Sequence, residues 1–370
     1  MAVLLEGSAT AEGTARYAAR FAHLPGHFGA LDGLALASVG LGTYLGREDD
    51  ATDRLYEHAV ERAVERGINV VDSAINYRHQ RSERAIGAAL RAAISRGALA
   101  RDEVFVATKG GYVPFDAAIP ADPRAWFAET YLRPGIMRPD DIVGGAHCMT
   151  PRYLLDQLER SRENLGLATL DLYYVHNPEG QLDEVDRDAF MARIRDAFDA
   201  LEGAVRDGRI RRYGTATWNG YRVDASEPGH LSLADLVRVA REVGGEDHHF
   251  GAIQLPYNLA MPEAFARATQ RIGDAFVPTL EAARQLDVYV MASASVYQGR
   301  LARDLSPVVA EYLPGLATDA QRALQFVRST PGIGTALVGM KTIEHVEENA
   351  GVAAVAPLPW ERFRRLFEGA

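Results

Sequence analysis

The chain has 370 residues, of which 47% are hydrophobic and 24% are charged, so it can bury a sizeable core. A formal net charge of −10 argues against a general nucleic-acid binder, because such proteins carry basic patches that contact phosphates. The single cysteine, Cys148, excludes an internal disulfide and any metal site built from several cysteines.

Eight short apolar or β-branched runs recur along the chain, in a repeating unit that continues into a longer segment with helical spacing. In chain order the runs span 34–42, 68–73, 104–109, 170–176, 210–218, 250–258, 288–295 and 334–340. Nearly continuous apolar strands that alternate with one-faced helices indicate a parallel sheet covered by helices. Eight units favour a (β/α)8 barrel, or TIM barrel, over an open doubly wound sheet. No linker rich in Pro, Gly or Ser divides the chain, so residues 1–370 are interpreted as one domain.

Two of the expected helices have clear boundaries. The segment 150–166 has Thr150 as N-cap, Pro151 in the first turn and Gly166 as a stop signal. The segment 188–208 carries apolar residues along one face and also ends at a glycine, the apolar residues being Phe190, Ile194, Phe198, Leu201 and Val205. Both are predicted to be amphipathic helices that cover the sheet.

The connection between the third strand and the helix at 150 is unusually long. Residues 110–149 far exceed the ~12–15 residues beyond which a loop is usually functional or disordered, and their aromatic side chains argue against disorder. In a barrel this loop emerges at the C-terminal face, where active sites lie. We interpret it as an inserted wall or lid of a substrate pocket. The alternative is a structural excursion that caps the barrel.

Polar residues stand where apolar strands end. Asp72 is next to last in the second run and Tyr77 lies in the loop after that run. Lys109 ends the third run, and His176 ends the fourth. Each of these residues alone is more typical of a structural or solvated position. Because neighbouring parallel strands lie only ~5 Å apart, we expect the four side chains to cluster on one rim of the barrel.

Such a cluster suits proton transfer to an oxygen atom. A tyrosine hydroxyl titrates near ~10, so we expect the Lys109 ammonium to lower the pKa of Tyr77. Asp72 would pair with Lys109, and His176 would donate a hydrogen bond to a substrate oxygen. The predicted chemistry is protonation of the alkoxide that forms from a carbonyl. A bound cofactor must supply the hydride.

These motifs resemble the aldo-keto reductase family. The matching segments are INVVDSAINYRHQRSERAIG (68–87), FVATKGG (105–111), DLYYVHNPE (171–179), GLGT (40–43), GRIRRYGTATW (208–218), QLPYNL (254–259) and VGMKTIEHVEENAG (338–351). The resemblance implies a barrel that uses nicotinamide dinucleotides, usually NADPH, to reduce aldehydes and ketones. It also implies a catalytic tetrad, which falls here on Asp72, Tyr77, Lys109 and His176.

By position, the resemblance implies cofactor contacts at several strand ends and in the last third of the chain. These residues are Gly42, Thr43, Asp72, Thr217, Gln254, Ser293, Gln298, Gly299, Leu301, Lys341, Thr342, His345, Glu348 and Asn349. Gln254 and the residues after the fifth strand would hold the nicotinamide amide, 293–301 would wrap the pyrophosphate, and 341–349 would hold the adenosine end. For Glu348 and Asn349 the alternative is a solvated helix face.

Two departures from the family pattern concern the cofactor. Ala216 and Thr217 stand where the family commonly has Ser and Asn, so one hydrogen bond to the carboxamide must come from Thr217, Asn219 or water. His345 stands where many NADPH-preferring members have an arginine, and a neutral imidazole is a weaker phosphate partner. The resemblance still favours NADP(H), with NAD(H) as the alternative.

The substrate pocket is expected to include Tyr44, Tyr112, Trp126, His147 and Trp218. The aromatic residues of the long loop suit stacking on a sugar or another ring, and they equally suit packing against the barrel. His147 is interpreted as pocket wall, with a second proton-transfer role as the alternative.

Other classes of function are disfavoured. The glycines at 40, 42 and 46 do not have the spacing of a dinucleotide-binding Rossmann motif. Strand ends carry neither His-x-His nor clustered carboxylates, so no metal site is predicted. No apolar run reaches ~18 residues, and the first residues do not have the pattern of a signal peptide, so a cytoplasmic location is expected.

The sequence therefore predicts an NADP(H)-dependent oxidoreductase that interconverts a carbonyl (aldehyde, ketone or sugar) and an alcohol, with Tyr77 as the general acid and base. Two alternatives are a nucleotide-binding regulatory subunit with little turnover and a redox-neutral enzyme with a tightly bound cofactor. The presence of all four tetrad residues favours the enzyme. The oligomeric state is not predicted.

Overall fold

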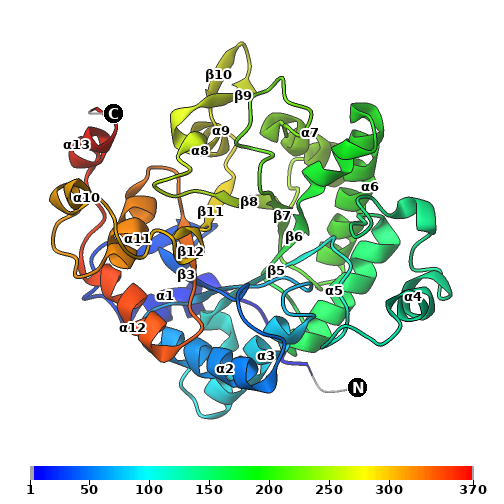
Figure 1. Ribbon diagram of the computed structural model, residues 1–370, viewed down its shortest axis with the longest axis horizontal. Coiled ribbons are helices and arrows are strands. Elements are labelled where there is room, and N and C mark those ends of the chain that lie inside the picture. The colour runs from blue at the N-terminus through cyan, green and yellow to red at the C-terminus, as the bar shows by residue number, and fades with distance from the viewer. Residues whose placement is uncertain (1–3, 369–370) are drawn as a thin grey trace.

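The computed structural model describes residues 4–368, and its centre is a closed barrel of parallel strands (Figure 1). The barrel strands are β3 (Val39–Gly42), β4 (Val70–Asp72), β5 (Phe105–Gly110), β6 (Leu172–His176), β7 (Tyr213–Ala216), β8 (Phe250–Pro256), β11 (Tyr289–Ser293) and β12 (Thr335–Gly339). Their order around the ring is their order in the chain, and β12 closes the ring by pairing with β3. Each predicted run overlaps one of these strands, and only β5 extends past its run, by one residue. The predicted (β/α)8 barrel is confirmed, and the open sheet is excluded.

Helices surround the barrel, as Figure 1 shows. Those of the outer layer are α2 (Asp50–Glu65), α3 (Arg81–Ser95), α5 (Pro151–Leu165), α6 (Arg187–Arg206), α7 (Leu233–Gly244), α9 (Thr279–Gln285), α11 (Asp319–Ser329) and α12 (Ile343–Ala350). Shorter or peripheral helices are α1 (Ala11–Ala19), α4 (Pro123–Phe127), α8 (Glu263–Ala266), α10 (Pro307–Tyr312) and α13 (Trp360–Phe363). The prediction for 150–166 is confirmed by α5, which starts after Thr150 and ends at Gly166, whose φ of 68° is the left-handed conformation that glycine adopts readily. The prediction for 188–208 is confirmed by α6.

The run 34–42 is not the single strand that was predicted. It divides at Ser38 into β2 (Leu34–Ala37) and the barrel strand β3. Strand β2 pairs antiparallel with β1 (Phe28–Leu31) through an Asp-Gly turn, which is a strong hairpin signal. A second hairpin, β9 (Ala268–Ile272) and β10 (Ala275–Pro278), was not predicted either. Both hairpins lie outside the barrel ring.

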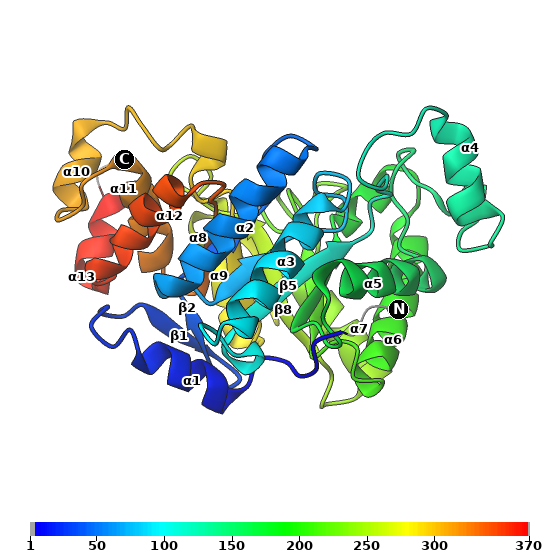
Figure 2. The same ribbon diagram turned by 90° about the horizontal axis from the view of Figure 1, so that it is seen from below.

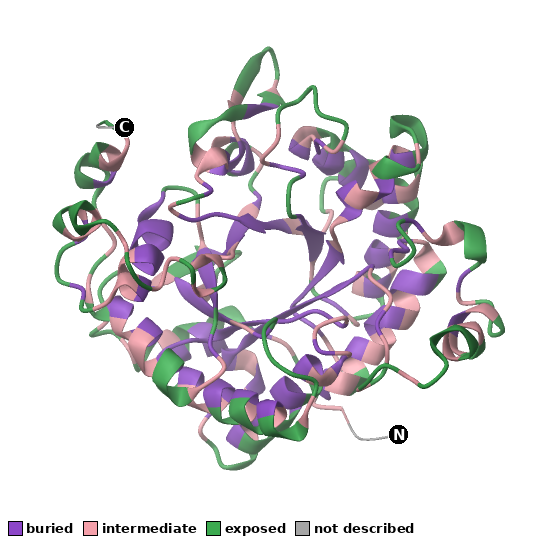
Figure 3. Cartoon of the chain, viewed as in Figure 1, coloured by how far each residue is buried: buried purple, intermediate pink, exposed green. Residues whose placement is uncertain are grey.

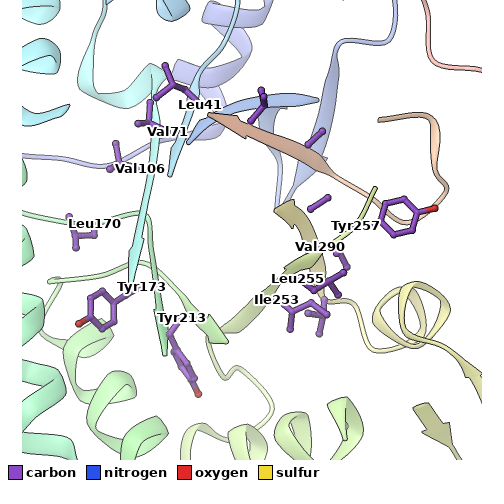
Figure 4. Close-up of a cluster of buried hydrophobic side chains, with 14 of the residues drawn as sticks. Leu41, Val71, Val106, Leu170, Tyr173, Tyr213, Ile253, Leu255, Tyr257 and Val290 are labelled. Carbon is purple, nitrogen blue, oxygen red and sulfur yellow. The ribbon is translucent and has the colours of Figure 1, made fainter. Parts of the chain in front are cut away.

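The main core lies between the strands and the helices, and a second cluster fills the barrel. Buried residues are concentrated on the strands and on the helix faces that meet them (Figure 3). Along β4, Val71 belongs to the core shared with the helices, where Figure 4 shows it beside Leu41 and Val106. Its neighbour Val70 belongs to the cluster inside the barrel, together with Phe105. This alternation follows the two-residue period of a strand. The strands run in parallel, so their last residues lie together at the barrel mouth.

The segment 110–149 forms a small folded unit of its own. It contains α4, a π-helix (Ala128–Leu132) and a 3-10 helix (Pro139–Asp141). Its hydrophobic cluster includes Trp126 and Tyr131 and extends to Tyr153 on α5, whose ring centroid lies 5.8 Å from that of Tyr131. Figure 2 shows α4 beyond α5, at the periphery of the molecule. The segment is therefore anchored on α5.

Hydropathy does not indicate a membrane crossing for any helix within residues 4–368, since none is both long and apolar enough.

A buried histidine links the first hairpin to the barrel. His27 donates from Nε2 to the carbonyl oxygen of Gly67 (2.9 Å), and its Nδ1 lies 3.2 Å from the Ser38 hydroxyl. Burial, together with the nearby Arg328 guanidinium, lowers the pKa of His27 to about 4. The folded chain therefore holds this imidazole neutral through the mildly acidic range.

We expect His27 to make the fold sensitive to mild acid. The histidine of an unfolded chain titrates near ~6.5, so between that pH and 4 the unfolded chain binds a proton that the folded chain does not. Stability therefore falls as the pH drops, by about 2 kcal/mol between pH 7 and pH 5 for this group. Urea unfolding of His27→Gln at both pH values should show that much less pH dependence than the wild type. The exposed His58, changed to Gln, is the control, and equal pH dependence of His27→Gln and wild type would contradict the assignment.

Candidate active site

A cavity of about 930 Å³ opens at the C-terminal ends of the barrel strands. Six barrel strands contribute their last residue to its lining, namely Gly42, Asp72, His176, Ala216, Ser293 and Gly339. Its volume is at the upper end of the roughly 300–1,000 Å³ of ligand pockets. The fold therefore brings the predicted strand-end residues together around one site.

Asp72, which lines this cavity, forms a buried ion pair with Lys109. Lys109 Nζ donates to Asp72 Oδ1 (2.6 Å) and to the carbonyl oxygen of Ser73 (2.6 Å). Gln254 Nε2 donates to the second carboxylate oxygen of Asp72 (2.9 Å). Burial raises the pKa of Asp72 and lowers the pKa of Lys109, and the attraction between the two charges opposes both shifts. Each charge is tolerated in this buried position because the other is beside it.

Tyr77 lies over this pair, with its ring centroid 5.0 Å from Lys109 Nζ. The tyrosine pKa is raised well above its usual value, first by burial and then by the negative charge of Asp72. The prediction that Lys109 lowers this pKa is therefore wrong. The physical reason is that Asp72 offsets the ammonium charge, and the ammonium lies against the face of the ring. Tyr77 thus stays protonated at neutral pH.

His176 stands beside Tyr77, and their ring centroids are 6.0 Å apart. Tyr112 also lies beside His176, with a centroid separation of 5.1 Å and nearly perpendicular rings. Burial, then the charge of Lys109, hold the pKa of His176 well below its usual value. The imidazole is therefore neutral, and it can act as a hydrogen-bond donor without adding charge to the site.

Most residues predicted to hold the cofactor line this cavity. They are Gly42, Thr43, Asp72, Thr217, Gln254, Ser293, Gln298, Gly299, His345, Glu348 and Asn349. Leu301, Lys341 and Thr342 are not part of the lining. The Thr342 hydroxyl accepts a hydrogen bond from the backbone N–H of His345 (3.3 Å) and caps α12, and Lys341 precedes this cap.

Several polar atoms of the lining have no hydrogen-bond partner among the described residues, although they are buried. They are Asn76 Oδ1, His176 Nδ1, Thr217 Oγ1 and Asn349 Oδ1. Buried polar groups in folded proteins are nearly always hydrogen-bonded. Their distribution, from the tetrad to the last turn of α12, fits an extended polar ligand that satisfies them.

The predicted substrate-pocket residues divide into two groups. Tyr44, Tyr112 and Trp218 line the cavity, and Tyr44 and Trp218 are 55% and 41% exposed at its mouth. Trp126 instead packs within the 110–149 segment, where its ring centroid lies 5.6 Å from that of Tyr131. His147 is buried outside the lining, and its Nε2 hydrogen-bonds the backbone carbonyl oxygen of His176. Tyr112 is the one residue of 110–149 in the cavity lining, so a wall or lid role for the rest of that segment stays a prediction.

Sequence reasoning missed several lining residues, among them Leu45, Asn76, Asn177 and Arg303. Asn177 adopts a left-handed φ of 45°. Asparagine tolerates that conformation better than most residues, so an asparagine directly after a strand was a local signal in the sequence. Arg303 had none, since it follows Gly299 in an irregular segment. Its place in the lining depends on how that segment folds back over the barrel mouth.

The chain uses lysine sparingly. Of its 40 Lys and Arg residues, only Lys109 and Lys341 are lysines. Both stand at positions predicted for the site, one in the tetrad and one before α12. Lysine presents a compact ammonium, whereas arginine presents a wide planar fork, so the two are not interchangeable.

Among the described residues no group of three or more His, Cys, Asp or Glu is arranged to hold a metal ion.

Comparisons with known proteins point to one family. The model of the aldo/keto reductase family matches residues 38–232. A horse protein named aldo-keto reductase family 1 member C23-like is 29% identical over 147 residues, which are 40% of this chain and 33% of the relative. Rho crystallin of the frog Aquarana catesbeiana is 27% identical over 209 residues, 54% of this chain and 52% of the relative. The matches thus span between a third and about half the length of these relatives.

Solved structures show the same fold at lower identity. An aldo/keto reductase of Klebsiella pneumoniae in complex with NADP and acetate superposes with a TM-score of 0.60 at 22% identity, over 93% of this chain and 95% of that one. The holo form of a Bacillus halodurans aldo-keto reductase gives a TM-score of 0.62 at 19% identity, over 92% and 94% of the two chains. The family model covers more than half of the 370 residues, including three of the strand ends that carry the tetrad. The chain belongs to the aldo/keto reductase family.

Proposed function

We propose that the protein is an NADP(H)-dependent oxidoreductase that interconverts a carbonyl compound and an alcohol. The observation that carries the proposal is the convergence of Asp72, Tyr77, Lys109 and His176 at one end of the large cavity, beside buried polar atoms without partners. NADPH, when bound, supplies a hydride. The chain itself supplies the acid, the oxygen-binding group and the charge that stabilises them.

Each tetrad residue has a role that its surroundings support. Tyr77 is protonated and faces the cavity, so it can donate its proton to the oxygen of the reduced carbonyl. His176 is neutral and orients that oxygen by a hydrogen bond. As negative charge develops on Tyr77, the nearby Lys109 ammonium stabilises it. Asp72 holds Lys109 in place. In the reverse direction the same groups accept the proton of an alcohol.

The substrate end of the cavity favours a neutral compound with a flat or cyclic face. Three aromatic residues, Tyr44, Tyr112 and Trp218, border it, and the amides of Asn76 and Asn177 are its nearby polar groups. Charged lining residues lie elsewhere, at the buried ion pair and along 303–348. Aromatic faces with a few hydrogen-bonding groups suit cyclic compounds, including sugars. Turnover of aromatic aldehydes and cyclic sugars with NADPH, followed at the nicotinamide absorbance, tests the proposal directly.

The adenosine end is assigned to the start of α12 and the segment before it. His345, Glu348 and Asn349 line the cavity there, and Arg303 faces the same space. Lys341 forms no salt bridge with any residue within 4–368, so its ammonium is available to an anionic group. A lysine beside a helix N-terminus suits a phosphate. This combination favours NADPH over NADH, as does the NADP held by the Klebsiella pneumoniae structure.

Lys341→Ala should weaken NADPH binding and spare NADH binding. The expected increase in the Kd of NADPH is roughly tenfold, because one charge-assisted contact to the 2′-phosphate is lost. The Kd of NADH should change by less than about twofold. Fluorescence titration of both nucleotides gives the comparison. Arg362→Ala, at a cationic position on α13, is the control, and equal weakening of NADPH and NADH would contradict the assignment.

The scarcity of lysine permits a second measurement without mutation. Lys109 is fully buried, so Lys341 is the lysine side chain that an amine-acylating reagent should modify. We expect NADPH to protect Lys341 and NADH to protect it less, as read by mass spectrometry. Equal labelling with and without NADPH would place the phosphate elsewhere.

A further inference from the structure

His147 lies behind the substrate end of the cavity and is not part of its lining. It comes from the end of the 110–149 segment and is 5% exposed. Its Nε2 is 2.7 Å from the carbonyl oxygen of His176, and its ring centroid is 5.1 Å from that of Tyr112. His147 therefore touches two residues that do face the cavity.

The hydrogen bonds around His147 fix which ring nitrogen carries the proton. A carbonyl oxygen only accepts, so Nε2 must donate to His176. On the other side, the Arg193 guanidinium only donates, so it takes the side-chain oxygen of Gln181. The amide nitrogen of Gln181 is then left to donate to His147 Nδ1 (2.8 Å). Burial and the charge of Arg193 also lower the pKa of His147, to about 4, so the ring is neutral.

The backbone is shaped to permit this close approach. Gly111 has a φ of +141°, and a Cβ atom at this position would lie 2.8 Å from His147 Nε2 and 3.0 Å from the His176 carbonyl oxygen. Any side chain there would push the imidazole away from the strand end. The absence of a side chain at 111 thus makes room for the contact between His147 and His176.

The same contact set continues to the cavity wall. Asn177 follows His176 in the left-handed conformation, and its side-chain nitrogen donates to the Tyr112 hydroxyl (3.2 Å). Tyr112 also pairs with His147 through an isolated antiparallel bridge that closes the base of the 110–149 segment. Tyr112, His147, His176 and Asn177 therefore form one connected unit.

We infer that His147 is a positioning residue, which holds the end of β6 and Tyr112 so that His176 meets the substrate oxygen at a fixed angle. The inference rests on the proposed function for its effect on turnover. It gives the 110–149 segment a function at the site that differs from that of a lid. Displacement of a substrate-orienting group by about 1 Å lowers rates by roughly 100-fold in favourable cases, so the effect should be measurable.

The experiment compares His147→Leu with His147→Gln. Leucine removes the donor to the His176 carbonyl, whereas glutamine keeps a donor for that carbonyl and an acceptor for Gln181. With NADPH and nitrobenzaldehyde we expect His147→Leu to lower kcat by roughly tenfold or more, with the Kd of NADPH changed by less than about twofold. His147→Gln should recover kcat to within about threefold of wild type. Phe127→Ala, which loosens the hydrophobic cluster of the same segment away from the cavity, is the control for general destabilisation.

A kcat of His147→Leu within about twofold of wild type, or an equal loss in His147→Gln and Phe127→Ala, would overturn the inference. A wild-type protein without turnover would instead overturn the proposed function. For that case a second measurement needs no substrate. Long-range ¹H–¹⁵N spectra of the histidine side chains should show His147 protonated at Nε2 alone, and His147→Leu should shift the His176 signals. A signal for the other tautomer of His147, or unchanged His176 signals, would overturn the inference.

Discussion

Tyr77→Phe should reduce carbonyl reduction to about one thousandth of the wild-type kcat or less, with NADPH bound as before. A positioned general acid contributes roughly 10²–10⁴-fold to such reactions, and phenylalanine removes only the hydroxyl. The ring contacts to Lys109, Tyr44 and His176 remain available to phenylalanine. Steady-state reduction of an aldehyde, together with fluorescence titration of NADPH, separates the two effects. A kcat within a few-fold of wild type would show that Tyr77 is not the acid.

The raised pKa of Tyr77 adds a pH signature to this result. Burial and Asp72 keep the hydroxyl protonated at and above neutral pH. The rate of reduction should therefore be flat between about pH 6 and 9, because the acid is present in its reactive form throughout. The control for tyrosine substitution is Tyr17→Phe. Tyr17 lies on α1, and this substitution removes the hydroxyl that donates to the Val64 carbonyl oxygen. A rate that falls across this range would indicate that a group with a lower pKa donates the proton.

The tetrad could be predicted from sequence because the barrel preserves chain order. Strands β4, β5 and β6 are consecutive both in the chain and around the ring. Residues that end them therefore meet at one rim, and a pattern of apolar runs with polar last residues is enough to find Asp72, Lys109 and His176. Tyr77 was expected in the same cluster because it lies in the loop after β4, but the sequence alone does not set the direction of a side chain in that loop.

The remaining features depend on packing that a linear pattern does not contain. The aromatic residues of 110–149 carry no period, so nothing distinguished Trp126, which packs inside the segment, from Tyr112, which lines the cavity. The direction of the Tyr77 pKa depends on how deeply the hydroxyl is buried and on where the ammonium lies relative to the ring. The Asp-Gly turn of the first hairpin is different, because its signal was present in the sequence and the longer apolar run obscured it.

Lys109→Met should have the largest effect on stability. Asp72 is almost fully buried, and without Lys109 its charge keeps only the hydrogen bond from Gln254. Removing one partner of a buried ion pair costs roughly 3–5 kcal/mol. We expect a decrease of that size in the free energy of unfolding in urea, together with the loss of measurable turnover. Lys341→Met, the same substitution at the only other lysine, is the matched control and should change stability by less than about 0.5 kcal/mol.

A double substitution distinguishes a lost pair from general damage to the barrel. Asp72→Asn in the Lys109→Met background removes the unpaired charge, so it should restore about 2 kcal/mol of the loss without restoring turnover. In Lys109→Met alone, the buried carboxyl of Asp72 has a pKa above that of the unfolded chain, so the folded state binds the extra proton. The stability of this variant should therefore fall as the pH rises above about 4, where the unfolded carboxyl ionises. Simple additivity of the two substitutions, or the absence of this pH dependence, would show that Asp72 and Lys109 do not act as a coupled pair. The charge that is proposed to stabilise ionised Tyr77 would then need another source.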